Sequence, residues 1–300
     1  MPVESDVLVP GPWTHRDLSA NGTRFHVAES GTGPLVLLLH GFPQLWWAWR
    51  HQLAALPDAG LRAVAPDLRG YGASDKPPRG YDAYTLAADV AGMVRALGEQ
   101  RAVLVGHDWG AAIAWTVAAL HPEVVERLVV CSTAHPLRHR EAALADPRGQ
   151  LRASAYMLGA QTPWVAERRL LAHDAARVGT LLDRWSGPGW PDAETRTMYR
   201  DAIRIPGVAH CSLEYYRWWV RSLVRPTGYR FFKRLQRPVT APTLQLHGAL
   251  DACVLPRTAL GSGRYVEAQY EWRLVEGAGH FLPEEAPDVV TGEVARWAKG

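Results

Sequence analysis

The chain has 300 residues, of which 47% are hydrophobic and 21% are charged, proportions that are ordinary for a globular protein. Its 33 basic and 30 acidic residues leave a formal net charge of +3, which is too small to favour a nucleic-acid partner. The three cysteines are odd in number and far apart, which argues against a disulfide framework or a thiolate metal site. The sequence shows neither an apolar run of membrane-spanning length nor a secretory signal pattern, so we predict a cytoplasmic protein that binds no membrane.

The first part of the chain alternates between apolar strands and helices. Residues 13–20 and 23–29 flank Asn21-Gly22, a strong signal for a β-hairpin. Short apolar runs then predict buried strands, and longer periodic runs predict helices. In order, we expect a strand at 35–39, a helix at 45–56, a strand at 61–65, a helix at 83–98, and strands at 102–105 and 128–131.

The pattern changes in the middle of the chain and then returns. Residues 135–237 contain helical segments rich in Arg, Trp and Tyr, without buried strands. Strands at 243–246 and 270–275 and a helix at 289–299 follow. This alternation predicts the α/β class, with a mostly parallel twisted sheet flanked by helices. We expect a core formed by residues 1–134 and 238–300, and a helical cap, or lid, formed by the insertion of residues 135–237.

The most informative stretch is Gly106-His107-Asp108-Trp109-Gly110, between the strand at 102–105 and a following helix. A Gly-x-nucleophile-x-Gly turn in this setting is the nucleophile elbow of the α/β-hydrolases. A carboxylate at a helix N-terminus stays ionised and needs no base to activate it. Its attack on a saturated carbon would give an ester, which suggests an epoxide or an alkyl halide as substrate. The alternative is that Asp108 only caps the helix.

The elbow, the motif His40-Gly41-Phe42-Pro43 and the capped core together resemble the epoxide hydrolase family over nearly the whole chain. The resemblance implies the α/β-hydrolase fold and a hydrolase acting on ether bonds. Haloalkane dehalogenases share the elbow, so the elbow alone does not decide the activity. The sequence leaves open whether the Phe42–Pro43 bond is cis.

A nucleophile, an acid and a histidine follow one another in the chain order expected of this fold. Asp251 comes just after a late strand and His280 lies in the loop after the next one, where the family has its acid and its histidine. His280, oriented by Asp251, would activate a water molecule to hydrolyse the ester on Asp108. The backbone N–H of Trp109 and, by resemblance, that of Phe42 would form the oxyanion hole.

Two tyrosines of the cap resemble the family's proton donors to the epoxide oxygen. Tyr156 lies five residues before Gln161, which begins the family's Gln-x-Pro stretch, and Tyr216 precedes an arginine. Adjacent helical residues point about 100° apart, so Tyr215 and Tyr216 cannot both face one cavity. Tyr199 is the reserve candidate.

Several aromatic side chains are expected to line an apolar pocket between cap and core, namely Phe42, Trp46, Trp109 and Trp164. They would favour a small hydrophobic epoxide.

These observations predict an epoxide hydrolase that forms a vicinal diol through a covalent ester on Asp108. Its partners are an epoxide and water as co-substrate, with neither a metal nor an organic cofactor; whether it forms a homodimer is open. One alternative is a haloalkane dehalogenase that uses the same Asp-His-Asp triad. Another is a non-catalytic ligand-binding protein on the same fold, since fold does not fix function.

Overall fold

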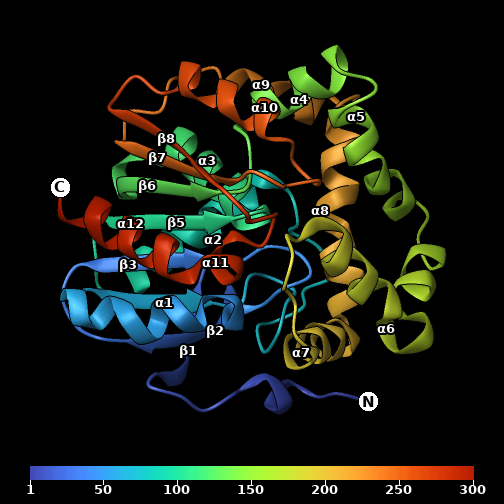
Figure 1. Cartoon of the computed structure of the whole chain (residues 1–300), viewed down its shortest axis with the longest axis horizontal. Helices are drawn as coiled ribbons and strands as arrows, with labels where there is room; N and C mark the ends of the chain where they lie inside the picture. The colour runs from blue at the N-terminus through green and yellow to red at the C-terminus, as the bar shows by residue number, and fades with distance from the viewer.

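The computed structural model describes residues 1–300, which are organised around one eight-stranded sheet (Figure 1). The strand order is β1-β2-β4-β3-β5-β6-β7-β8; β2 pairs antiparallel with β1 and with β4, and all other neighbours are parallel. The predicted α/β class with a mostly parallel sheet is therefore confirmed. The strands are β1 (Thr14–Ala20), β2 (Thr23–Ser30), β3 (Leu35–Leu39), β4 (Arg62–Pro66), β5 (Ala102–His107), β6 (Val125–Cys131), β7 (Thr243–Gly248) and β8 (Tyr270–Val275).

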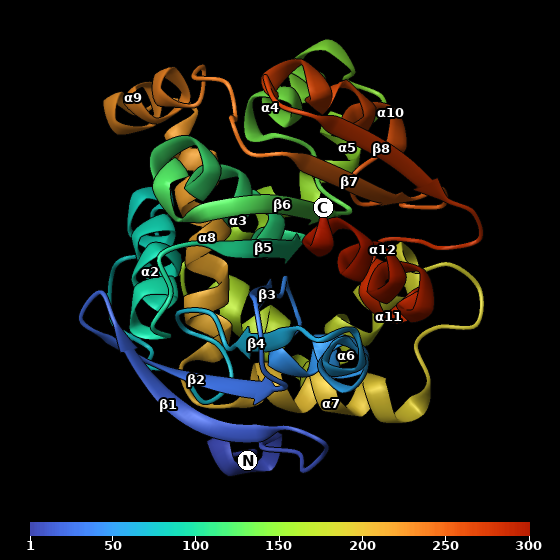
Figure 2. The same ribbon diagram turned by 90° about the vertical axis from the view of Figure 1, so that its left-hand side faces the viewer.

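Helices cover both faces of the sheet, with α2 and α3 on one face and α1 and α12 on the other (Figure 2). Every residue of β3, β5 and β7 is buried, which explains the uninterrupted apolar runs at 35–39 and 102–105; the polar residues of β7, Thr243, Gln245 and His247, are buried as well. The α-helices of the core are α1 (Arg50–Ala55), α2 (Ala83–Ala96), α3 (Trp109–Leu120), α10 (Pro256–Ala259), α11 (Leu282–Glu285) and α12 (Pro287–Lys299). None of the helices of the chain combines the length and the apolar character needed to cross a bilayer.

The local signals at the start of the chain are confirmed, with one difference. Asn21 and Gly22 have φ values of 45° and 71°, as a two-residue hairpin turn of type I′ requires. The expected helix at 45–56 is instead divided into a 3₁₀ turn at Trp46–Trp49, α1, and a second 3₁₀ turn at Leu56–Ala59. All four side chains of the first turn are buried in the core, and a 3₁₀ turn, with three residues per turn, distributes its side chains around the whole axis. The 3₁₀ segments of the chain are η1 (Glu4–Val7), η2 (Trp46–Trp49), η3 (Leu56–Ala59), η4 (Pro122–Val124), η5 (Ser154–Gln161) and η6 (Leu260–Tyr265).

The segment between β6 and β7 contains no strand and lies across the carboxyl ends of the parallel strands (Figure 1). Its helices are α4 (Pro136–Ala145), α5 (Gln150–Ala153), α6 (Val165–Trp185), α7 (Ala193–Arg204), α8 (Val208–Ser222) and α9 (Pro226–Arg234), and η5 belongs to the same segment. We refer to the helices α4 to α9 with η5 as the cap. Helix α6 is interrupted at Ala172–Ala175, where the backbone leaves the helical conformation.

A buried carboxylate joins the cap to the core. Glu284, on α11, forms an ion pair with Arg50 and accepts a hydrogen bond from Gln44. The hydroxyl of Tyr199, on α7 of the cap, donates to the same carboxylate over 2.6 Å. Tyr199, the reserve catalytic candidate, therefore has a structural partner and does not line the pockets at Asp108 that are described below.

We expect Tyr199→Phe to lower the free energy of unfolding by about 1 kcal/mol, because it removes a buried hydrogen bond and keeps the ring. Urea denaturation followed by tryptophan fluorescence measures the change. Tyr229→Phe is the matched control, because the Tyr229 side chain is 70% exposed. Equal midpoints for the two variants would show that the bond to Glu284 does not stabilise the docked cap.

Candidate active site

Asp108 occupies a strained turn between β5 and α3, with φ 50° and ψ −117°. A positive φ of this kind costs a non-glycine residue about 1–3 kcal/mol and persists only where the surroundings enforce it. The neighbouring segments approach so closely that a Cβ at Gly110 would lie 2.1 Å from the carbonyl oxygen of Leu39. A Cβ at Gly41 would lie 2.4 Å from the Cβ of Asp108. Only glycine fits at these two positions, and the turn fixes the Asp108 carboxylate at the carboxyl edge of the sheet.

The Asp108 carboxylate has one backbone partner and one imidazole partner. Its Oδ1 accepts a hydrogen bond of 2.8 Å from the Phe42 N–H, which follows β3, and the Phe42–Pro43 bond is cis. Its Oδ2 lies 3.4 Å from Nε2 of His280. Burial opposes ionisation, but the hydrogen bond and charge of His280 and the Phe42 N–H outweigh it, so the pKa of Asp108 is lowered.

His280 and Asp251 lie behind the nucleophile, each just past the end of a strand. Nδ1 of His280 lies 2.9 Å from Oδ2 of Asp251, and both side chains are fully buried. The other Asp251 oxygen accepts the N–H groups of Cys253 and Val254 over 2.8 and 2.9 Å. The structure thus brings together Asp108, Asp251 and His280, the three residues that the sequence analysis selected as a triad.

The charge of His280 depends on both carboxylates. Burial disfavours the imidazolium, but the negative charge of Asp251 and the hydrogen bonds to Asp108 and Asp251 more than offset this. They raise the pKa of His280 to about 10. At neutral pH the group therefore consists of two carboxylates sharing one imidazolium.

The loop that carries His280 is held by groups that the sequence analysis missed. The His280 N–H donates to the carbonyl of Trp185, at the end of α6, over 2.8 Å. His107 Nε2 donates to the His280 carbonyl over 2.7 Å, and burial lowers the pKa of His107 to about 4, so its ring is neutral. The carboxylate of Glu285 accepts the N–H of Gly279 over 2.7 Å. Of these groups, only His107 belongs to a motif that the sequence analysis had identified, because it stands next to Asp108 in the elbow.

Tyr156 on η5 and Tyr216 on α8 face each other with ring centroids 5.6 Å apart. Burial raises the pKa of both hydroxyls well above the usual value, so both stay protonated. The Tyr216 hydroxyl has no hydrogen-bond partner within the protein, and that of Tyr156 lies 3.6 Å from the Cys253 sulfur. Tyr215 points elsewhere, as expected for the adjacent helical residue, and donates to the carbonyl of Arg69 over 2.8 Å.

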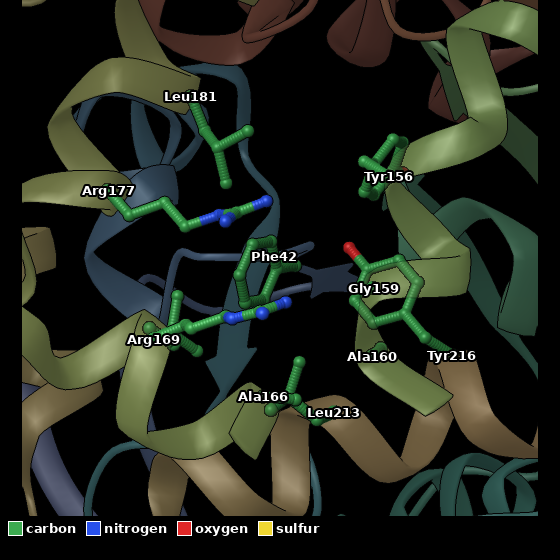
Figure 3. Close-up of a pocket in the computed structure, with 11 residues that line it drawn as sticks. Phe42, Tyr156, Gly159, Ala160, Ala166, Arg169, Arg177, Leu181, Leu213 and Tyr216 are labelled. Atoms are coloured by element: carbon green, nitrogen blue, oxygen red, sulfur yellow. The ribbon is translucent and has the colours of Figure 1, made fainter. Parts of the chain in front are cut away.

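Two pockets share Tyr156 as a lining residue. The first lies between cap and core, and its lining includes Phe42, Tyr156 and Tyr216 (Figure 3). The second lies on the side of Asp108 and Trp109, and Tyr156 lines it as well. The Trp109 ring packs edge-on against Tyr216, with centroids 5.0 Å apart. Tyr156 thus lies between the pocket that Tyr216 lines and the pocket that Asp108 lines, and both are mostly apolar.

Two of the residues expected to line the pocket, Trp46 and Trp164, line neither of these two pockets. Trp46 is fully buried, and its indole donates to the carbonyl of Val7 over 2.9 Å and packs on Trp13, so it belongs to the core. Trp164 precedes α6 with its side chain 83% exposed. The number of tryptophans in a sequence does not tell which way each one faces, because packing between elements decides that.

Comparisons with known proteins agree with this architecture. The family model of the alpha/beta hydrolase fold matches residues 34–287. Epoxide hydrolase 2 of Siraitia grosvenorii is 44% identical, covering 95% of this chain and 98% of the relative, and epoxide hydrolase A of Mycobacterium tuberculosis is 31% identical, covering 97% and 98%. The solved structure of a mutant epoxide hydrolase from Bacillus megaterium is 28% identical, with a TM-score of 0.83 over 95% of this chain and 100% of that one. The chain therefore belongs to the epoxide hydrolase family of the α/β hydrolase fold.

Proposed function

We propose that this protein hydrolyses an epoxide to a vicinal diol through a covalent ester on Asp108. The observation that carries the proposal is that Tyr156, whose hydroxyl is protonated, lines both the pocket of the second protonated tyrosine, Tyr216, and the pocket of the ionised Asp108. An epoxide needs both groups, because the carbon must be attacked while the oxygen gains a proton. The relatives named epoxide hydrolases support the same reaction, and the Bacillus megaterium structure was solved with its propane-1,2-diol product.

In the first step Asp108 attacks a ring carbon of the epoxide. The Phe42 N–H occupies Oδ1, which leaves lone pairs of Oδ2 free for the attack. The carbon–oxygen bond of the ring breaks, and the leaving oxygen takes a proton from Tyr156 or Tyr216. The products of this step are an ester on Asp108, a free hydroxyl on the substrate and a tyrosinate.

Formation of the ester changes the charge of His280. The ester no longer carries the negative charge of Asp108, which is one of the groups that raise the pKa of His280. The tyrosinate is a strong base, because burial raises the pKa of both tyrosines well above the usual value. It takes the proton from the imidazolium, which restores the tyrosine and leaves His280 as a neutral base. Ester formation in the first step thus makes His280 available as the base for the second step.

In the second step His280 takes a proton from water, and the resulting hydroxide attacks the ester carbonyl. The N–H groups of Phe42 and Trp109 stabilise the oxyanion, and Asp251 stabilises the imidazolium. When the intermediate collapses, the diol leaves with the proton from His280. The new carboxyl of Asp108 then returns its proton to His280, which regenerates the starting ion pair.

The haloalkane dehalogenase alternative uses the same ester chemistry but a different leaving group. A halide departs without a proton, so that reaction gives Tyr156 and Tyr216 no role. The adduct that accumulates when the base is removed distinguishes the two reactions.

We expect His280→Gln to stall at the ester, because no base remains to activate water. After incubation with terminal epoxides and bromoalkanes, intact-protein mass spectrometry should show an adduct equal to a whole epoxide, and peptide mapping should place it on Asp108. The double variant Asp108→Asn with His280→Gln is the control and should gain no mass. An alkyl adduct without bromine, together with no epoxide adduct, would favour the dehalogenase; no adduct from either reagent would contradict nucleophilic catalysis by Asp108.

We expect Tyr156→Phe and Tyr216→Phe each to lower kcat/KM for epoxides roughly 10- to 100-fold, and the double variant roughly 10²- to 10⁴-fold, because proton donation to the leaving oxygen is lost. Steady-state diol formation measures the effect. Tyr84→Phe, on the outer surface of α2, is the matched control. Activity of the double variant equal to that of the control would remove both hydroxyls from the mechanism.

We expect Asp108→Asn to lower the pKa of His280, because it removes the charge that the ester also removes. Histidine NMR across a pH titration measures the shift, with Asp183→Asn, an exposed carboxylate paired with Arg196, as control. Because the pKa of His280 is raised from 6.5 to about 10, its ion pairing stabilises the fold fully below pH 6.5, and this stabilisation is lost as the pH rises towards 10. An unchanged His280 titration in Asp108→Asn would refute the coupling between ester formation and release of the base.

A further inference from the structure

Two arginines of the cap line the same pocket as the tyrosine pair. Arg169 and Arg177 extend their guanidinium groups into it, on the side opposite Tyr156 and Tyr216 (Figure 3). No acidic residue is among the groups that line this pocket. Two cations therefore share the space next to the proton donors, with no counter-charge in the pocket lining.

The acidic residues near these arginines in the sequence are paired elsewhere. The carboxylate of Glu167 forms an ion pair with Arg217 over 2.9 Å, Asp174 pairs with Arg204 over 2.9 Å, and Asp183 pairs with Arg196 over 2.7 Å.

The break in α6 lies between the two arginines, so they come from different halves of the helix. In an uninterrupted helix, residues eight positions apart are separated by about 12 Å along the axis. Here Ala172 is extended, and His173, Asp174 and Ala175 follow with φ values of 53°, 54° and 56°. Each left-handed residue costs about 1–2 kcal/mol, so a chain that met no constraint would not keep three of them.

Contacts with α7 hold this break in place. Arg200 donates from Nε to the carbonyl of Asp174 over 2.8 Å and from an amino group to the carbonyl of His173 over 3.3 Å. Ala175 is completely buried. The break is therefore a packed and hydrogen-bonded part of the cap.

The wall between the arginines and the tyrosines is apolar. Ala166, Leu170, Leu181 and Leu213 contribute to it. Arg169 and Arg177 are exposed, whereas Tyr216 is 2% exposed. The pocket therefore runs from charged side chains near the surface to the Tyr216 hydroxyl in the interior. A ligand that matches this gradient has an anionic end, an apolar chain and a group that accepts a proton.

We propose that the pocket selects epoxides that carry a carboxylate on an apolar chain, with the carboxylate bound by Arg169 and Arg177. The inference rests on the proposed epoxide hydrolase function and specifies its substrate class. The guanidinium fork matches a carboxylate in a bidentate manner, and two forks from different halves of α6 hold it in one orientation. The epoxide ring then lies at the tyrosines, so the arginines select the substrate and take no part in bond breaking.

The test compares terminal epoxyalkanoates of increasing chain length with their methyl esters, which have the same chain and no charge. We expect kcat/KM for the acid to exceed that for the ester by about tenfold at the best chain length, since charge-assisted hydrogen bonds to partly exposed groups are of this strength. The preference should fall as salt is added. The double variant Arg169→Gln with Arg177→Gln should lose the preference, so that its kcat/KM for the acid falls to that for the ester.

Arg168→Gln is the matched control, because Arg168 is an exposed neighbour that does not line the pocket. If the wild-type protein hydrolyses acids and esters equally well, or if the double variant keeps the preference, the inference is overturned and the proposed function stands.

A binding measurement separates the inference from the reaction. Tryptophan fluorescence titrations with hexanoate and hexanamide, neither of which reacts, should show tighter binding of hexanoate, and the double variant should lose the difference. This result without turnover of any epoxide would reject the proposed function and retain the carboxylate site. Equal binding of the acid and the amide would overturn the inference whatever the turnover.

Discussion

The close packing of three backbone segments around Asp108 is the constraint on which the rest of the structure depends. Gly41, Gly106 and Gly110 lie where a single Cβ would collide with neighbouring atoms, and Asp108 itself adopts a strained φ. The loops after β3 and β5 are thereby locked together, and the Phe42 N–H reaches the carboxylate. Because parallel strands end at one edge of the sheet, the loops after β7 and β8 meet the same point. The register of the sheet, more than any single contact, sets the distances within the site.

Charge balance organises the buried site as strongly as sheet geometry does. Asp108, Asp251 and His280 together carry one net negative charge when the imidazolium is present. Burying two carboxylates is costly, and the shared imidazolium and the backbone N–H groups at Asp108 and Asp251 compensate for this cost. Under the proposed mechanism the arrangement is stable only while Asp108 is ionised. Loss of that single charge lowers the pKa of His280 and so favours the neutral base that ester hydrolysis needs.

The core could be predicted from the sequence because local signals and the global fold agree there. Asn21-Gly22 specifies a turn that few other dipeptides allow, and the uninterrupted apolar runs at 35–39 and 102–105 have the length of buried strands. The direction in which each aromatic side chain points could not be predicted. Trp46 and Trp164 are equally aromatic, yet one is in the core and the other is in solvent. The break in α6 between Arg169 and Arg177 contains neither glycine nor proline, and contacts from α7 stabilise it, so it could not be predicted either.

The neighbouring positions of β6 and β7 in the sheet have a consequence for how such proteins diversify. The chain leaves the sheet after Cys131 and returns at Thr243, and these two strands are directly paired. The whole cap is therefore one insertion in the crossover between two paired parallel strands, so its replacement need not change the strand order of the core. Under the proposed function, the core carries out the nucleophilic attack and the ester hydrolysis. Neither of these steps depends on which leaving group departs from the substrate carbon. The cap contributes the hydroxyls and the arginines. A lineage that exchanged its cap would change the leaving group and the preferred substrate in one event, while inheriting the nucleophile and its base intact.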